Sequence, residues 1–139
     1  MIHTGGCHCG ALGYEYRTSL APSGWSVRAC QCSFCRSHGA LSSSDPRGSL
    51  GFVIRDPARL VRYRFGLRTA EFLICAQCGV YVGALIATPR GQFGIININA
   101  LQPQPAGLPP PQAVSYEDEG QLERTARREA RWTPIAGRI

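Results

Sequence analysis

The chain has 139 residues, of which 44% are hydrophobic, and this size and composition fit one globular domain with a single core. No apolar run approaches the about 18 residues that a membrane span requires, and Cys7, Cys9 and Glu15 interrupt the region where a signal peptide would need an apolar block. We therefore expect a soluble, cytoplasmic protein with no membrane partner. In that compartment clustered thiols are more often metal ligands or catalysts than disulfides, and a secreted, disulfide-stapled domain is the alternative.

The formal net charge is +6, and all fifteen basic residues are arginine. Residues 1–110 contain ten arginines and four acidic residues, whereas residues 111–139 contain five of each. Seven thiolates and two zinc ions would add −3 to the cysteine-bearing part, which lowers its charge to about +3. We therefore do not expect a nucleic-acid partner, despite the pI of 9.2.

The first hundred residues are typical of strands joined by turns. Alternating or continuous apolar residues predict strands at 11–17, 25–30, 51–54, 60–65, 70–74, 80–87 and 93–100. The Ser- and Gly-rich stretch over 36–50 indicates a loop with a turn at 45–48. In the 60–65 strand we expect Val61, Tyr63 and Phe65 to point inward, and Arg62 and Arg64 to point outward.

The last third of the chain changes character. Residues 102–111 hold five of the ten prolines, which indicates an extended surface segment. After it, Ser115 and Asp118 resemble a capping box, and a spacing of four predicts a helix with one apolar face, made of Leu122, Ala126 and Ala130. We expect the arginines over 124–131 to be its solvent-exposed surface. The predicted organisation is a zinc-binding domain over 1–101, a Pro-rich segment over 102–114, and a helical tail over 115–139 packed on the same domain.

The outer cysteine pairs predict one closed metal site. Four sulfurs bound to zinc lie roughly 3.8 Å from one another, so each pair must come from a tight turn. Both pairs are followed by a glycine, Gly10 or Gly79, which suits a turn with positive φ. We assign a structural zinc to these four residues, with two unrelated buried thiol pairs as the alternative: Cys7, Cys9, Cys75 and Cys78.

The remaining three cysteines, Cys30, Cys32 and Cys35, lie within six residues and predict a second, open zinc site. Three thiolates leave one coordination position, where zinc can take water or a substrate thiol and lower its pKa. In one alternative His38 or another side chain closes the site, and in another Cys32 and Cys35 form a redox pair. His38 is also a candidate proton carrier.

Three blocks of this sequence resemble the signature blocks of the glutathione-dependent formaldehyde-activating enzyme (GFA) family. They are Gly5-Gly6-Cys7-His8-Cys9-Gly10-Ala11, Cys30-Gln31-Cys32-Ser33-Phe34-Cys35-Arg36 and Phe72-Leu73-Ile74-Cys75-Ala76-Gln77-Cys78-Gly79. The resemblance covers about residues 5–100. It implies an all-β, Mss4-like tent of antiparallel sheets, a structural zinc on the four outer cysteines and a catalytic zinc on the central three. It also implies a carbon–sulfur lyase that joins formaldehyde to glutathione.

The resulting expectation is a zinc-dependent enzyme whose partner is a small thiol or a thiol–aldehyde adduct such as that of glutathione. Five arginines are candidates for holding the substrate carboxylates, although arginines that alternate along a strand are usually solvated: Arg28, Arg36, Arg62, Arg64 and Arg68. The competing expectation is a zinc-stabilised binding module, because Mss4-like folds also serve as protein-interaction domains. An open fourth ligand position on the zinc of the three central cysteines discriminates between them, and a homodimer is compatible with either.

Overall fold

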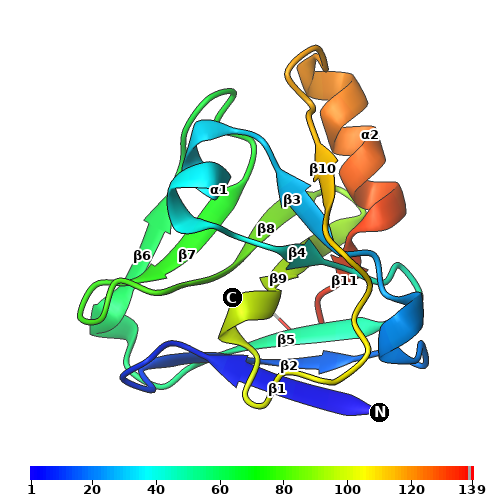
Figure 1. Ribbon diagram of the computed structural model, residues 1–139. Helices are drawn as coiled ribbons and strands as arrows, with labels where there is room; N and C mark the ends of the chain where they lie inside the picture. The colour runs from blue at the N-terminus through cyan, green and yellow to red at the C-terminus, as the bar shows by residue number, and fades with distance from the viewer. Residues whose placement is uncertain (138) are drawn as a thin grey trace.

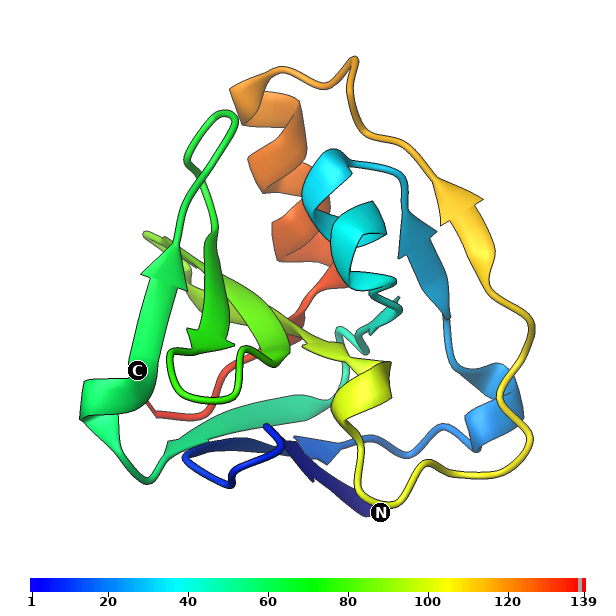
Figure 2. The same cartoon turned by 60° about the vertical axis from the view of Figure 1, so that its left-hand side comes forward.

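The structure is a computed structural model that describes residues 1–137 and 139, and it consists of two β-sheets with two α-helices (Figures 1 and 2). The smaller sheet, called the base sheet, has the order β1-β2-β5, with β1 (Ile2–Gly6), β2 (Leu12–Arg17) and β5 (Ser49–Ile54). The larger sheet has the order β10-β3-β4-β9-β8-β7-β6, and β11 also pairs with β9. Its strands are β3 (Arg28–Cys30), β4 (Ser42–Ser43), β6 (Leu60–Tyr63), β7 (Glu71–Cys75), β8 (Tyr81–Thr88), β9 (Gly91–Asn97), β10 (Gln112–Val114) and β11 (Thr133–Pro134).

The two helices are α1 (Ser33–His38) and α2 (Gln121–Arg131), and three short 3-10 turns complete the secondary structure. In both views the base sheet forms one end of the molecule and the helices lie at the other (Figures 1 and 2). The predicted mainly-β fold with a short C-terminal helix is confirmed. One pairing departs from the antiparallel expectation, because β10 runs parallel to β3. Within the described residues no helix is long and apolar enough to cross a bilayer.

The base sheet follows the alternation of its sequence. Leu12, Tyr14 and Tyr16 are all at most 1% exposed, whereas Glu15 between them is exposed. This is the period of two that puts successive side chains on opposite faces of a sheet. The hydroxyl of Tyr14 donates to the backbone carbonyl of Asn97 at 2.9 Å. The base sheet is therefore joined to β9 by a buried hydrogen bond as well as by the apolar core.

Two clusters of buried residues form the core. The first lies between the sheets and includes Leu12, Leu50, Leu73 and Val82. The second lies between the larger sheet and the two helices, and includes Phe72, Tyr81 and Trp132. The first cluster stabilises the sandwich of sheets, while the second lies beneath the helices.

Helix α1 was not expected from the sequence, which indicated a strand end followed by a loop. The Cys32 side chain accepts a hydrogen bond from the Cys35 backbone N–H as its N-cap, and Gly39 ends the helix with φ of 57°. A single turn and a half has too few residues to show a helical period, so the capping geometry is its only local signal. The helix orients Cys35 toward Cys30 and Cys32.

Several predicted elements need correction. Strand β3 covers only the end of the predicted 25–30 strand. Val61 and Tyr63 are 40% and 45% exposed rather than inward, because β6 is the last strand of its sheet. The N-cap of α2 is Gly120, so Ser115 and Asp118 do not form a capping box.

Helix α2 is also rotated relative to the prediction. Its apolar positions Leu122, Ala126 and Ala130 are exposed, whereas Arg128 is buried and Arg124 and Arg127 are half-buried. The expectation that the arginines over 124–131 form a solvent-exposed surface is wrong for these three and holds for Arg131. The sequence pattern of α2 therefore predicts that its apolar face packs on the protein, whereas its arginine face does so in the structure.

The segment after α2 fixes this orientation. Trp132 is 5% exposed and packs in the second core cluster. The fully buried Thr133 hydroxyl accepts a hydrogen bond from the Asp45 backbone N–H at 2.8 Å, and β11 pairs with β9. Because Trp132 and Thr133 fix the C-terminal end of α2, these residues determine the rotation of the helix about its axis, and its apolar positions do not.

Candidate metal centres and the adjoining cavity

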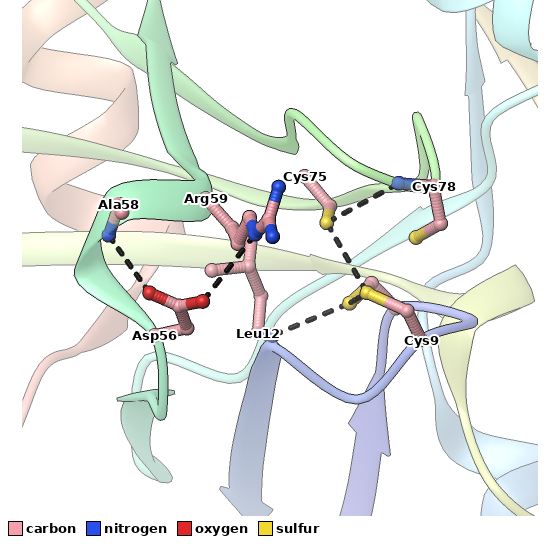
Figure 3. Close-up of polar contacts among 8 residues, drawn as sticks. Cys9, Leu12, Asp56, Ala58, Arg59, Cys75 and Cys78 are labelled. Atoms are coloured by element: carbon pink, nitrogen blue, oxygen red, sulfur yellow. Dashed lines mark hydrogen bonds and ion pairs between the residues drawn. The ribbon is translucent and has the colours of Figure 1, made fainter.

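The four outer cysteines meet where two hairpins approach each other. Cys7 and Cys9 lie in the turn between β1 and β2, Cys75 is the last residue of β7, and Cys78 lies in the turn between β7 and β8. Figure 3 shows the sulfurs of Cys9, Cys75 and Cys78 turned toward one another. The Sγ atoms of Cys7 and Cys9 are 3.7 Å apart, and those of Cys9 and Cys75 are 3.5 Å apart. The sequence assignment of these four residues to one group is matched by the geometry, because all four sulfurs lie within 4.8 Å of one another.

This four-cysteine site suits a zinc ion. The sulfur separations are close to the roughly 3.8 Å between ligands at the corners of a tetrahedral zinc–thiolate site. Backbone N–H groups of Leu12 and Cys78 donate to the sulfurs of Cys7 and Cys75 at 3.2 and 3.5 Å, which stabilises thiolates. Gly10 and Gly79 have φ of 85° and 78°, as their positions after the cysteines predict. The site is compatible with a closed structural zinc.

The three central cysteines form a second group, also within 4.8 Å of one another. Cys30 ends β3, Cys32 caps α1 and Cys35 lies in its first turn. The Cys35 backbone N–H donates to the Cys32 sulfur at 3.4 Å. Within residues 1–137 and 139, no histidine, carboxylate or further cysteine joins this group as a fourth ligand. The site could hold a metal ion on three sulfurs.

The three thiols do not share their protons equally. A hydrogen bond from the Cys35 thiol lowers the pKa of the Cys30 thiol to about 5. The same interaction, together with burial, raises the pKa of the Cys35 thiol. Three thiols this close stabilise one thiolate and oppose further ones unless a cation is bound. The donor set therefore favours binding of a soft divalent cation.

A cavity of about 180 Å³ opens beside the three-cysteine site. Cys30, Cys32 and Cys35 line it, whereas none of the four cysteines of the other site does. Its apolar wall comes from the second core cluster and from the loop after β6, with Phe65, Phe72, Ile95 and Trp132. Four arginines also line the cavity: Arg28, Arg124, Arg127 and Arg128.

Of the five arginines proposed from the sequence, only Arg28 lines the cavity. Its guanidinium donates to the hydroxyls of Ser26 and Ser44, the latter at 2.9 Å. Arg62 and Arg64 pair with Glu71 at 3.4 and 3.7 Å instead. Arg36 and Arg68 are exposed and do not line the cavity. The rings of His38 and Phe34 are tilted by 45° with centroids 4.5 Å apart, and His38 belongs to neither cysteine group.

Sequence reasoning missed Arg124, Arg127 and Arg128, since charged residues on a helix are expected to face water. It also missed Tyr81, whose hydroxyl is buried without a hydrogen-bond partner among the described residues. Burial, reinforced by the thiols of Cys35, Cys32 and Cys30, raises the pKa of Tyr81 well above its ordinary value. The phenol is therefore a neutral group next to the three-cysteine site. No signal in the sequence distinguishes it from the other apolar-strand residues.

Comparison with known proteins gives a fold but no activity. No family model matches the sequence. A crystal structure of a Rhodobacter sphaeroides protein, a structural-genomics target, is similar to this one with a TM-score of 0.56 and 28% sequence identity. The match covers 80% of this chain and 99% of that chain. The likeness therefore supports the architecture described here, and the function has to be argued from the cysteine sites and the cavity.

Proposed function

We propose that the protein is a zinc-dependent enzyme of the carbon–sulfur lyase type, related to the GFA family, that acts on a thiol–aldehyde adduct. The type compound is S-hydroxymethylglutathione. The observation that carries this proposal is the difference between the two cysteine groups, because the three-sulfur group lines the cavity and the four-sulfur group does not. A three-ligand zinc site with an adjoining cavity is the arrangement of catalytic rather than structural zinc.

The reaction is the reversible cleavage of an S-hydroxymethyl compound into a thiolate, formaldehyde and a proton. The carbon–sulfur bond breaks and its electron pair stays on sulfur. The O–H bond of the hydroxymethyl group supplies the pair for the new carbonyl bond, and its proton leaves to solvent. When bound at Cys30, Cys32 and Cys35, zinc would supply a Lewis acid that favours the thiolate over the thiol.

The chain's own residues provide the remaining requirements of this chemistry. The aromatic side chains of Phe65, Phe72 and Trp132 line the space beside the cysteines and lower its polarity. The cationic side chains of Arg28 and Arg128 lie on the same cavity and favour the anionic, thiolate side of the equilibrium. Tyr81 remains protonated and adds no negative charge beside the thiols.

Calorimetric titration of thiols and thiol–formaldehyde adducts into the zinc-loaded protein tests this proposal. Binding should release a proton, which is measured by repeating the titration in two buffers of different ionisation enthalpy. Cys35→Ser should lose thiol binding and one zinc ion, whereas Ser37→Ala, on the exposed side of the same helix, should change neither. Formaldehyde release from the adduct above its spontaneous rate would support the lyase assignment.

The competing proposal is a zinc-stabilised binding module without catalytic activity. It predicts that a fourth protein ligand completes the second zinc site in solution, and that no thiol or adduct binds at millimolar concentration. Either result would replace the lyase proposal. X-ray absorption at the zinc edge, which counts sulfur and lighter ligands, measures the first of these directly.

A further inference from the structure

Helix α2 turns its charged face toward the protein. Leu122 is 87% exposed, whereas Arg128, six residues later, is only 8% exposed. Burying arginine in place of leucine costs free energy unless the charge meets a partner. The orientation of α2 therefore needs an explanation in terms of what its arginines bind.

Arg128 has too few partners for a buried cation. Its Nη1 donates to the Thr69 hydroxyl at 2.9 Å, and its guanidinium lies 4.9 Å from the centre of the Trp132 ring. Its Nε is buried without a hydrogen-bond partner. Among the residues that the structure describes, no carboxylate forms an ion pair with it. A guanidinium has five N–H donors and is rarely buried with so few of them satisfied.

The other cavity arginines are compensated to different degrees. Arg127 is paired with Glu119 through two hydrogen bonds of 2.8 and 3.0 Å. Arg124 lies 3.7 Å from the same carboxylate and has a buried Nε without a hydrogen bond. Arg28 donates only to two serine hydroxyls. One carboxylate thus serves two arginines, and both Arg28 and Arg128 lack an anionic partner among the described residues.

The charge of the neighbouring metal site does not remove this excess. Zinc with three thiolates carries −1 in total, which balances one of the two unpaired arginines. Burial, followed by repulsion from Arg127 and Arg124, lowers the pKa of Arg128 to about 10, so its guanidinium is still charged at neutral pH. The carboxylate of Glu117 also lines the cavity. The four arginines therefore face Glu119, Glu117 and the −1 of the zinc site, and a net charge of +1 remains for an anionic group of the ligand.

The size of the cavity restricts the rest of that ligand. A volume of about 180 Å³ is close to that of an engineered cavity of about 150 Å³ that binds benzene, a molecule of about six non-hydrogen atoms. A short thiol acid such as 3-mercaptopropionate, also with about six non-hydrogen atoms, matches this space, whereas pockets for larger ligands are about 300–1,000 Å³. The apolar wall of Phe65, Phe72 and Ile95 suits a short alkyl chain between the sulfur and the anionic group.

We propose that this cavity binds a small thiol with one carboxylate or sulfonate, with its sulfur toward Cys30, Cys32 and Cys35 and its anionic group on Arg128. Arg28 and Arg124 add positive charge beside it. The inference rests on the proposed function and changes its substrate, because the thiol is smaller than glutathione.

Fluorescence of Trp132 provides the test, since Arg128 lies against its ring. Trp25, the other tryptophan, lies in the first core cluster, so Trp25→Phe leaves Trp132 as the only tryptophan reporter. Zinc-loaded protein with this change is titrated with 3-mercaptopropionate, 2-mercaptoethanol, cysteamine and glutathione. We expect 3-mercaptopropionate to bind about tenfold or more tightly than 2-mercaptoethanol, as a charge-assisted hydrogen bond provides. Cysteamine should bind most weakly.

Substitutions assign the effect to the arginine. Arg128→Gln should bring 3-mercaptopropionate to the affinity of 2-mercaptoethanol while leaving 2-mercaptoethanol unchanged. Arg131→Gln, exposed on the same helix, should change neither thiol. Circular dichroism and zinc content confirm that each variant folds. If Arg128→Gln does not fold, Arg28→Gln replaces it, and we expect a smaller loss of affinity for 3-mercaptopropionate.

The outcomes separate the two proposals. If 2-mercaptoethanol matches 3-mercaptopropionate, or if glutathione binds more tightly than either, the small-anion inference is overturned and thiol binding at the zinc site stands. If no thiol binds, the proposed function fails and the inference fails with it. If Arg128→Gln loses affinity for 3-mercaptopropionate and keeps its affinity for 2-mercaptoethanol, both proposals are supported.

Discussion

The two cysteine sites use one ligand type for different purposes, and the difference lies in where the ligands come from. The four-cysteine site joins the β1–β2 turn to the β7–β8 turn, about seventy residues apart in sequence, next to the first core cluster. The three-cysteine site takes all its ligands from six consecutive residues at the start of α1. A metal that joins distant segments stabilises the fold, whereas one bound by a single segment can be exchanged or exposed to substrate at little cost to the fold.

Removing one sulfur from each site tests this difference in role with the largest expected effect. Cys75→Ser should cause the largest loss, because Cys75 is 1% exposed and its site holds the two sheets together. Structural zinc contributes free energy comparable to the whole stability of a domain, about 5–15 kcal/mol, so we expect insoluble or unfolded protein. Cys32→Ser should leave a folded protein with one zinc ion instead of two. Thermal unfolding combined with zinc analysis measures both effects.

Equal loss of thermal stability in the two variants would contradict this division of roles. Partial folding of Cys75→Ser would still be informative if amide exchange were faster at the β1–β2 and β7–β8 turns than around α1. The converse pattern, with exchange fastest around α1, would assign the structural role to the other site.

The unpaired charges beside the three-cysteine site predict that removing one of them will stabilise the folded protein. Arg128→Met removes a buried charge without an anionic partner and keeps the aliphatic volume, but it also removes the hydrogen bond to Thr69. We expect the free energy of unfolding to increase by about 1 kcal/mol, reduced by the contribution of that hydrogen bond. Urea unfolding of the zinc-loaded protein measures this change. Arg131→Met, on the exposed side of the helix, should change stability by less than about 0.5 kcal/mol. A clear loss of stability in Arg128→Met would mean that the arginine is structural.

Much of the fold was predictable from the sequence because it depends on local periods. The alternation at 11–17 gives β2 with its buried Leu12, Tyr14 and Tyr16, and the glycine after each outer cysteine pair gives the two turns with positive φ. The grouping of the seven cysteines into four and three was also predictable, because only tight turns bring sulfurs to the required separation. The turns depend on residues near one another in sequence, whereas the joining of the two outer pairs was predicted from the four ligands that a closed zinc site requires.

The cavity was not predictable for the opposite reason. Its arginines face inward because Trp132 and Thr133 hold the end of α2, and these contacts reach residues in β9 and in the loop after β4. A helical period finds the two faces of α2 but does not say which one meets the protein. Hydrophobicity would choose Leu122 and Ala126, and the structure shows Arg124 and Arg128. Tertiary anchoring has overridden the local preference.

The orientation of α2 can be tested directly, with the smallest expected effect of these experiments. Leu122→Gln replaces a side chain that is 87% exposed, so stability should change by less than about 0.5 kcal/mol. Were α2 packed through its apolar stripe, the same change would leave a polar group in the core and cost about 2–5 kcal/mol, as for other large buried aliphatic residues. Leu50→Ala, at a position that is 0% exposed, is the matched control and should show the larger loss. Urea unfolding of both variants decides the matter, because a Leu122→Gln loss close to that of Leu50→Ala would return the arginines to the surface and remove the anion site from the cavity.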